Sequence, residues 1–362
     1  MSTDLVLGDH MQKQKITRGF YVHFIAIVLA FLSANASAQP LGKIEKVVVH
    51  GTALKGNLDG DSPDRDVFIY LPPGYDTNSS QRYPVVYLLH GYGLRAEGWM
   101  GFARIEVGAN TAMTGNGGGV GTGERAMEMI VVSPDAYTLY DGSMYSSSVN
   151  TGDWETFIAS DLVSYVDEHY RTLPTRESRG LAGHSMGGYG TMRIGMKHPE
   201  VFSALYPLSA CCMLDGGEPS EAITIAGKYT TREQVAELKY PNKSTLARAA
   251  AWSPNPGKPP FFLDLPVTDG TEHPEIQAKW FANSILPMLD QYTLNLRQYS
   301  AIQFDVGLDD GLLGVNQQLD AAMVQAKIPH TFETYEGNHN NKVFERIETK
   351  VLPFFSKHLR GE

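Results

Sequence analysis

Short apolar runs alternate with helical patterns along this chain, and this alternation constrains its fold more than any other feature. Eight apolar runs, many with β-branched residues, lie at 44–50, 66–71, 85–90, 129–132, 180–184, 204–208, 301–306 and 331–335. Most are short and bounded by turn residues, as strands are. Helical spacing of apolar residues occurs at 154–169, 186–196, 315–326 and 344–359. Strands that alternate with helices form a mostly parallel sheet covered by helices on both faces. We therefore expect an α/β fold whose ligand site lies beyond the carboxyl ends of the strands.

One segment interrupts this alternation, between the sixth and seventh predicted strands. Residues 214–300 are rich in proline and contain helical fragments at 232–238, 244–251 and 274–290. Loops of that length are uncommon in compact domains, so we expect an inserted cap or lid near the site. A peripheral elaboration away from the site is the alternative. The expected organisation is one catalytic domain over residues 39–362 that carries this insertion.

The first 38 residues have the pattern of a secretory signal peptide. Three basic residues precede an uncharged, mostly apolar run at 20–32, and small residues at 36–38, Ala-Ser-Ala, form a cleavage pattern. The apolar run is shorter than the roughly 20 residues that a membrane-spanning helix needs. We therefore expect cleavage near Ala38, a secreted or periplasmic protein, and no stable membrane anchor.

Charge and cysteine content exclude several classes of protein. The chain carries 40 acidic and 30 basic residues, a formal net charge of −10, and no basic cluster stands out, so we expect no nucleic-acid partner. The two cysteines, Cys211 and Cys212, are adjacent and cannot close loops as a disulfide framework does. The fold must therefore rest on its hydrophobic core, for which a 42% hydrophobic content is sufficient.

A serine between glycines follows the predicted strand 180–184. The segment reads GLAGHSMGG over 180–188, so Gly183, Ser185 and Gly187 form a Gly-x-Ser-x-Gly pattern between a strand and a helix. This is the setting of a nucleophile elbow, where the turn is so sharp that only small residues fit beside the serine. A small residue in a tight turn is the structural alternative, but it would leave the loops described next unexplained. We expect Ser185 to be a catalytic nucleophile.

A serine hydroxyl needs a base to take its proton and an acid to orient that base. In this fold class the chain order is serine, acid, histidine. Among the later histidines, His339 lies in YEGNHNN, a loop directly after the last predicted strand, and it is the expected base. Asp309 and Asp310 both lie in GLDDG, directly after the preceding strand. The residues alone leave these two aspartates as alternative acids.

The oxyanion of the reaction intermediate needs donors that are already in place, and backbone N–H groups supply them. We expect one donor from Met186, directly after the nucleophile. The other is expected from Tyr92, in LLHGYG after the third predicted strand, where glycines permit a close backbone approach. This chemistry requires neither a metal ion nor an organic cofactor.

Six motifs carry a resemblance to a known family. They are DVFIYLPPGY at 66–75, YPVVYLLHGYG at 83–93, MIVVSPDAY at 129–137, DWETFIASDLVSYVDEHYRT at 153–172, GLAGHSMGGYGTM at 180–192 and GLDDGLL at 307–313. In combination they resemble the esterase D family of α/β-hydrolases, which includes feruloyl esterases, S-formylglutathione hydrolases and mycolyltransferases. The resemblance covers roughly residues 44–210 and 300–358. It implies the α/β-hydrolase fold, with a mostly parallel eight-stranded sheet, helices on both faces and an inserted cap.

The resemblance also bears on the site residues. The family's acid typically follows a Gly-Thr-x pattern, which implies Asp310 here, with Leu308 in place of the threonine and Asp309 as the alternative. The Gly-x-His context of the family's base matches His339. In the mycolyltransferases the residue after a His-Gly or Asp-Gly pair supplies an oxyanion amide, and this residue corresponds to Tyr92.

The expected function is that of a secreted serine carboxylesterase. It would hydrolyse small-molecule or polysaccharide-linked carboxylic esters, feruloyl and other aryl esters among them, through an acyl-enzyme. One alternative is an acyltransferase of the mycolyltransferase type with the same triad, in which an alcohol replaces water. Another is a carbohydrate-binding protein that keeps the fold without the chemistry.

Overall fold

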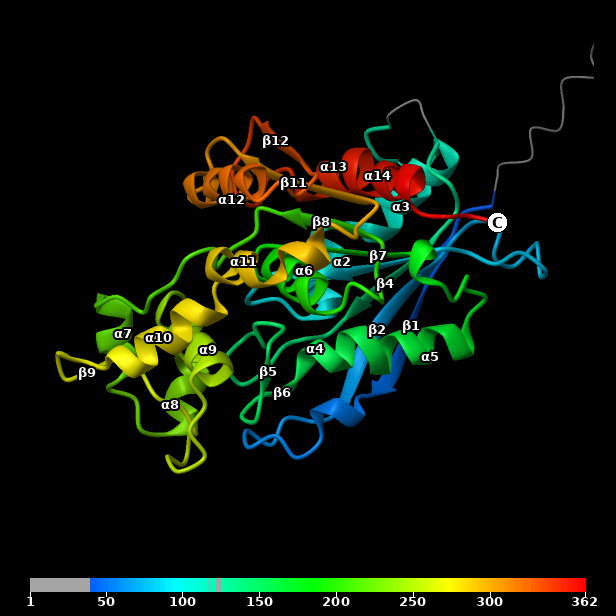
Figure 1. The fold of residues 1–362 in the computed structure, drawn as a ribbon. Coiled ribbons are helices and arrows are strands. Elements are labelled where there is room, and N and C mark those ends of the chain that lie inside the picture. Colours follow the sequence, from blue (N-terminus) through cyan, green and yellow to red (C-terminus); the bar gives the residue numbers. More distant parts are fainter. Residues whose placement is uncertain (1–39, 117, 122–124) are drawn as a thin grey trace, which may run out of the picture. The chain divides into compact units, whose positions relative to one another are not determined.

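The computed structural model describes residues 40–116, 118–121 and 125–362. The expected signal peptide and its cleavage site lie outside the described residues. Within the unit Leu41–Glu362, eight strands form one sheet (Figure 1). In sheet order these strands are β1 (Lys43–His50), β2 (Asp64–Leu71), β4 (Ile130–Pro134), β3 (Val85–Leu89), β7 (Arg179–His184), β8 (Ala204–Leu208), β11 (Ala301–Gly307) and β12 (Thr331–Tyr335).

The sheet is mostly parallel, as predicted. Neighbouring strands from β4 to β12 pair in parallel, whereas β2 pairs antiparallel with both β1 and β4. All eight predicted strands are confirmed, with bounds within two residues of those expected. Because β3, β7, β8, β11 and β12 run in one direction, their carboxyl ends lie at the same edge of the sheet.

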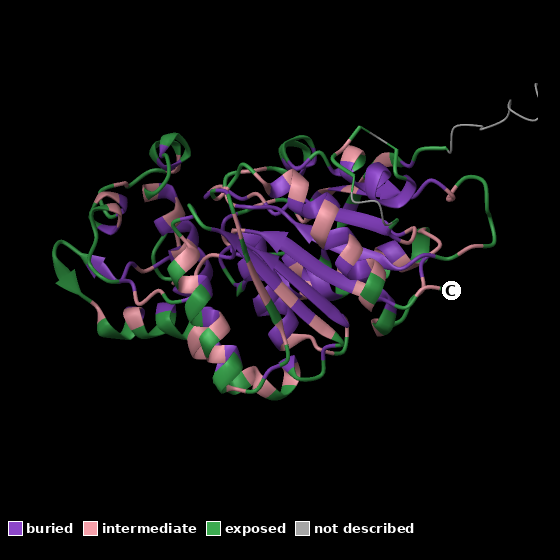
Figure 2. Ribbon diagram, turned by 90° about the horizontal axis from the view of Figure 1, so that it is seen from above, coloured by how far each residue is buried: buried purple, intermediate pink, exposed green. Residues whose placement is uncertain are grey.

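The central strands are buried on both faces, which explains why they are continuous apolar runs in the sequence. Side chains of β3 alternate between two cores: Val85, Tyr87 and Leu89 pack on one face, and Val86 and Leu88 pack on the other. Figure 2 shows the strands at the centre of the sheet as buried. The sheet is therefore the middle layer of three.

Helices supply the two outer layers. The first core includes apolar residues of α4 (Trp154–Thr156), α5 (Leu162–His169), α6 (Met186–Lys197), α11 (Ile285–Leu296) and α12 (Leu313–Gln325). The second core includes residues of α2 (Ala96–Phe102), α3 (Ile105–Thr114), α13 (Val343–Arg346) and α14 (Leu352–His358). The four predicted helices are present, and the one expected at 154–169 consists of α4, a π-helical turn at Phe157–Asp161 and α5.

The inserted segment 214–300 contributes a group of helices beside the sheet (Figure 1). Its elements are α7 (Glu221–Ala226), α8 (Arg232–Glu237), α9 (Asn242–Trp252), the β9–β10 pair (Val267–Thr268 and Thr271–Glu272), α10 (Pro274–Asn283) and α11. Two hydrogen bonds join α9 to the region of β5 (Ser147–Ser148): Ser148 Oγ donates to the carbonyl of Ala250 over 2.6 Å, and Trp252 Nε1 donates to Ser146 Oγ over 3.3 Å. Of the helices that the structure describes, none is long and apolar enough to cross a membrane.

Candidate active site

The predicted site residues come from loops at the carboxyl edge of the sheet. Ser185 directly follows β7, Tyr92 follows β3, Asp310 follows β11 and His339 follows β12. These strands are far apart in the sequence but neighbours or near neighbours in the sheet. Parallel strands thus place at one edge four groups that the sequence spreads over almost 250 positions.

Ser185 occupies a sharp turn between β7 and α6. Its backbone has φ of 58° and ψ of −112°, a conformation that side-chain-bearing residues rarely adopt. The flanking glycines make this turn possible: a Cβ on Gly183 would collide with the backbone of Gly187, and a Cβ on Gly187 would collide with the carbonyl of Leu89. The Gly-x-Ser-x-Gly pattern is therefore a packing requirement of the turn that presents the serine hydroxyl.

Ser185, His339 and Asp310 form a continuous chain of hydrogen bonds. His339 Nε2 lies 2.9 Å from Ser185 Oγ, and His339 Nδ1 lies 2.8 Å from Asp310 Oδ2. Since an ionised carboxylate only accepts, Nδ1 carries the proton and Nε2 is left to accept the serine proton. Asp309 is exposed to solvent, and its backbone N–H donates to the carbonyl of Gly337 over 2.9 Å. The structure thus brings Asp310, and not Asp309, to the histidine.

The Asp310 carboxylate is kept ionised by its partners. Its side chain is 2% exposed, and this burial alone would raise its pKa. Hydrogen bonds from His339 and from the backbone N–H of Leu312, the latter 2.9 Å long, outweigh burial and hold the pKa of Asp310 below its ordinary value. The hydroxyl of Ser209 contributes in the same direction. A buried negative charge is therefore available to stabilise a protonated His339.

The two expected oxyanion donors belong to segments next to the serine: Met186 follows it in the chain, and Tyr92 belongs to a neighbouring turn. Met186 is the first residue of α6, where a backbone N–H has no partner within the helix and the helix dipole favours negative charge. Tyr92 belongs to the turn after β3, which approaches Ser185 closely: a Cβ on Gly91 would lie 3.5 Å from Ser185 Cβ. Tyr92 Oη also donates to the carbonyl of Tyr140 over 2.8 Å, which anchors this turn.

His90 orients the peptide group that contains the Tyr92 N–H. The backbone N–H of Ala136 donates to His90 Nε2 over 2.9 Å, so the proton is on Nδ1, which donates to the carbonyl of Gly91 over 2.8 Å. In a trans peptide the C=O and the next N–H point in opposite directions. Fixing the Gly91 carbonyl therefore also fixes the Tyr92 N–H. Burial lowers the pKa of His90, which favours the neutral ring that this arrangement needs.

Sequence reasoning missed His90 and also His184, which precedes the nucleophile. The only signals were the His-Gly and His-Ser dipeptides in LLHGYG and GHSMGG. Both imidazoles are buried and contact backbone groups of the site. Neither contact can be derived from local spacing, because the partners of both rings include residues far along the chain.

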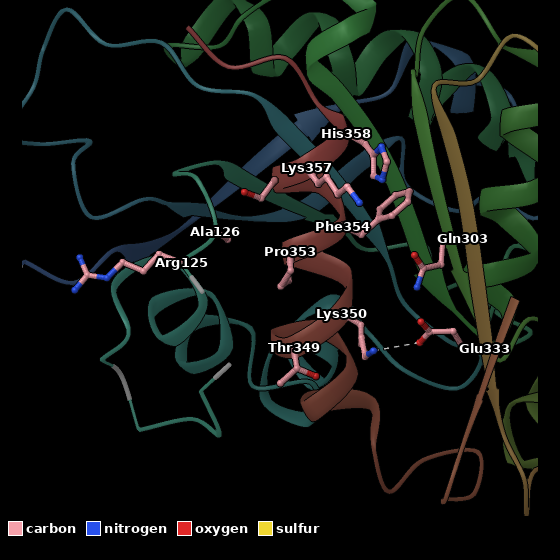
Figure 3. A pocket seen from close by; sticks show the side chains of 11 residues that line it. Arg125, Ala126, Gln303, Glu333, Thr349, Lys350, Pro353, Phe354, Lys357 and His358 are labelled. Carbon is pink, nitrogen blue, oxygen red and sulfur yellow. Dashed lines mark ion pairs between the residues drawn. The ribbon is translucent and has the colours of Figure 1, made fainter. Parts of the chain in front are cut away.

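A surface pocket away from the candidate site residues is lined mainly by polar and charged side chains (Figure 3). Its volume is about 370 Å³, and it is lined by Arg125, Ala126, Gln303, Glu333, Thr349, Lys350, Pro353, Phe354, Ser356, Lys357 and His358. The lining carries charges of both signs, and Lys350 pairs with Glu333 over 3.4 Å. None of the candidate site residues belongs to this lining. Across the described part of the chain, no three His, Cys, Asp or Glu side chains form a group that could hold a metal ion.

Comparison with known proteins identifies a family for the chain. A family model described as "Putative esterase" matches residues 62–348. An esterase of Mycobacterium tuberculosis is 29% identical over 143 residues, which are 38% of this chain and 27% of that protein. An endo-1,4-beta-xylanase/feruloyl esterase of Xylanibacter ruminicola is 28% identical over 139 residues, 37% of this chain and 18% of that protein. The matches thus span about a quarter or less of these relatives.

Solved structures show the same fold over most of the chain. A ferulic acid esterase superposes with a TM-score of 0.60 at 22% identity, covering 88% of this chain and 99% of that one. An S-formylglutathione hydrolase from Agrobacterium tumefaciens superposes with a TM-score of 0.58 at 15% identity, covering 88% and 96%. At these identities the likeness concerns the α/β-hydrolase fold.

Proposed function

The chain belongs to the esterase family whose model spans most of its length, and from this premise we propose that it is a serine carboxylesterase. The observation that carries the proposal is the hydrogen-bonded chain from Ser185 through His339 to Asp310. A nucleophile, a base and an orienting acid in this order are what acyl transfer from an ester requires.

Acylation begins when Ser185 Oγ attacks the ester carbonyl while His339 Nε2 takes the serine proton. The resulting oxyanion accepts hydrogen bonds from the backbone N–H groups of Met186 and Tyr92. Losing one such donor typically slows catalysis by about 10² to 10³-fold. His339, now protonated and paired with Asp310, gives its proton to the leaving alcohol, and the acyl group stays on Ser185.

Deacylation repeats these steps with water as the nucleophile. His339 takes a proton from the water as it attacks the acyl carbonyl, and the same two amides stabilise the second oxyanion. The carboxylic acid leaves as His339 returns the proton to Ser185 Oγ. These residues therefore perform both half-reactions without a metal ion or an organic cofactor.

Aryl esters, feruloyl esters among them, are the substrate class that we propose. The relative from Xylanibacter ruminicola and several solved structures with this fold are described as feruloyl or ferulic acid esterases. On this chain, the ring of Tyr240 is 76% exposed and its centroid lies 6.3 Å from that of Tyr92. An exposed aromatic ring beside an oxyanion turn suits a flat aromatic group, because such rings pair by stacking or edge contacts.

The proposal is tested by replacing the nucleophile. Ser185→Ala is expected to remove nearly all hydrolysis of methyl ferulate and of an aryl acetate, whereas Ser80→Ala, on an exposed loop, keeps the parent rate. Release of acid and alcohol is measured by chromatography, and circular dichroism reports on folding. Activity of the folded Ser185→Ala variant within tenfold of the parent would refute the assignment.

Two further parts of the proposal have separate tests. If the acyl-enzyme reacts with alcohols in preference to water, added alcohol will suppress acid release and accumulate a new ester, which would make the protein an acyltransferase. We also propose export with cleavage near Ala38, so mass spectrometry of exported protein should find Gln39 at its N-terminus. An intact leader on exported material would overturn that part.

A further inference from the structure

His184 stands next to the nucleophile but has no part in the proposed reaction steps. It is the last residue of β7, and its side chain is buried in the second core. Its ring is stacked on Trp99 with centroids 6.1 Å apart and an interplanar angle of 10°, and the ring of Phe102 lies at 6.4 Å. A histidine enclosed in this way cannot exchange protons freely with solvent. Its position beside Ser185 therefore needs an explanation other than acid–base catalysis.

The ring of His184 makes one polar contact with the loop that carries the base. Its Nε2 lies 2.8 Å from the carbonyl oxygen of His339, and the two imidazole centroids are 4.7 Å apart. A carbonyl only accepts, so the proton of His184 is on Nε2 and the ring donates. The donor belongs to the residue before the nucleophile, and the acceptor belongs to the backbone of the base.

His184 is suited to be a permanent donor. Burial, reinforced by the nearby His339, lowers the pKa of His184 to about 3. At neutral pH the ring is therefore uncharged, and it does not compete with His339 for the serine proton. Its other nitrogen lies close to the oxyanion turn, since a Cβ on Gly91 would be 3.2 Å from Nδ1.

We propose that His184 is a positioning residue, whose Nε2–H holds the backbone of His339 so that the base stays within hydrogen-bonding distance of Ser185. The inference rests on the proposed esterase activity and adds to it a residue that acts through the base. The His339 loop follows β12 at the edge of the sheet, where only one neighbouring strand supports it. A bond from the central strand β7 therefore ties this loop to the element that also carries the nucleophile.

The expected consequence concerns the chemical step more than substrate binding. A misplacement of about 1 Å between reacting groups can slow catalysis by roughly 100-fold. Without the His184 donor the His339 loop can shift, while the surfaces that contact substrate are unchanged. We therefore expect kcat to fall by about 10- to 100-fold and KM to change by less than about threefold.

The test compares three replacements of His184. His184→Gln keeps an amide N–H at a reach similar to that of Nε2, His184→Asn has the same amide one carbon shorter, and His184→Leu has no donor. We expect the Gln variant to retain kcat within about fivefold, and the Asn and Leu variants to lose about 10- to 100-fold, with KM nearly constant. Rates are measured with an aryl acetate, and a fluorophosphonate probe counts folded active sites. His50→Leu, at an exposed position at the end of β1, is the matched control.

The outcomes separate this inference from the proposed function. A Leu variant with kcat within threefold of the parent, or a Gln variant no better than Asn, would overturn the positioning role. The comparison between Gln and Asn decides the matter even if the Leu variant does not fold, because the two amides differ only in reach. If the parent protein hydrolyses no ester, or Ser185→Ala hydrolyses as fast as the parent, the esterase proposal itself fails.

Discussion

Ser185 has a rarely populated backbone conformation, and its hydroxyl lies within hydrogen-bonding distance of His339. Residues in such sparsely populated regions cost of order 1–3 kcal/mol each, and they persist only where the surroundings determine them. Here the surroundings are Gly183 and Gly187, whose missing side chains let β7, α6 and β3 approach each other. The two glycines therefore do more than permit a turn, because they place the serine hydroxyl beside His339.

The two adjacent aspartates of GLDDG can be replaced one at a time to test which of them orients His339. Asp310→Asn leaves an amide opposite His339 Nδ1, which favours the wrong tautomer, so we expect kcat to fall by about 10³ to 10⁴-fold. Asp309→Asn alters an exposed side chain and is expected to leave kcat within about threefold. Steady-state kinetics on an aryl acetate decide between them. A larger loss in the Asp309 variant would show that the acid is misassigned.

His90 provides a prediction about the oxyanion. His90→Leu removes the donor to the Gly91 carbonyl, so the Gly91–Tyr92 peptide can rotate and its N–H leaves the oxyanion. We expect a loss of about 10² to 10³-fold in kcat, the effect of losing one oxyanion donor. His90→Asn, whose amide nitrogen lies near the position of Nδ1, should lose less. Equal losses in the two variants, measured on the same ester, would contradict the orienting role.

The sequence indicates Ser185 and His339 as candidate nucleophile and base because each has a local signature. Gly-x-Ser-x-Gly after a strand and a histidine loop after the last strand can both be recognised within ten residues. The choice between Asp309 and Asp310 could not be made from residues alone, because both lie in one turn and only the backbone path decides which carboxylate faces His339. The family resemblance favoured Asp310, and the structure places that residue beside the base.

The helices α2 and α3 are not predicted from the sequence, and there is a physical reason for this. Their sequences, AEGWMGF and IEVGANTAMT, contain three glycines, each of which costs a helix up to about 1 kcal/mol relative to alanine. Packing overrides this preference: Trp99 and Ile105 are almost completely buried in the second core. Helices that depend on tertiary contacts in this way have a weak local pattern, whereas α6 and α12 follow recognisable strands and were predicted.

The inserted segment is joined to the rest of the chain by a largely buried ion pair as well as by hydrogen bonds. Lys243, in the first turn of α9, lies 2.6 Å from Asp141, and the Lys243 side chain is 6% exposed. Asp141 also accepts from Tyr137 Oη over 2.5 Å. The carbonyl of Asp141 accepts from the N–H of Gly93, in the oxyanion turn. Docking of α9 is thus linked to the turn that carries Tyr92.

Removing one partner of this pair should destabilise the protein. Lys243→Met leaves the Asp141 carboxylate without its cation, and because that carboxylate is 20% exposed we expect a loss of about 2–3 kcal/mol in the free energy of unfolding. Lys342→Met is the control, since the side chains of Lys342 and its partner Glu345 are 39% and 40% exposed, and its loss should stay below about 1 kcal/mol. Urea denaturation followed by fluorescence measures both. Equal losses would show that α9 is not docked through Lys243.

For the protein as a whole, the sequence predicts the three-layer architecture. It also predicts where the insertion lies in the chain, but not where it packs in space. Continuous runs of apolar residues in the sequence indicate parallel strands, because strands covered on both faces have no polar side. The insertion lacks such a pattern, and its place depends on contacts such as that of Arg232 on α8 with Asp59, between β1 and β2. Those contacts join positions more than 170 residues apart, beyond the range of any periodicity.

The burial of Asp59 makes the stability of the protein depend on pH. Asp59 Oδ1 accepts from Arg232 over 3.2 Å and from Tyr140 Oη over 3.3 Å, and the Asp59 side chain is fully buried. Burial, with a contribution from the charge of Asp61, raises the pKa of Asp59 to about 7 against the opposing effect of Arg232. Between the ordinary pKa of 3.8 and this value the folded protein binds a proton that the unfolded chain does not.

Stability contributed by this proton is complete below the unfolded pKa and is lost as the pH rises through the folded one. We therefore expect the melting temperature of the parent to fall by a few degrees more between pH 5 and 8 than that of Asp59→Asn, whose side chain stays neutral. Differential scanning calorimetry across that range measures the difference. Asp76→Asn, at an exposed site, is the control and should follow the parent. Parallel curves for the parent and Asp59→Asn would mean that Asp59 is ionised throughout, with the charge of Arg232 compensating its burial.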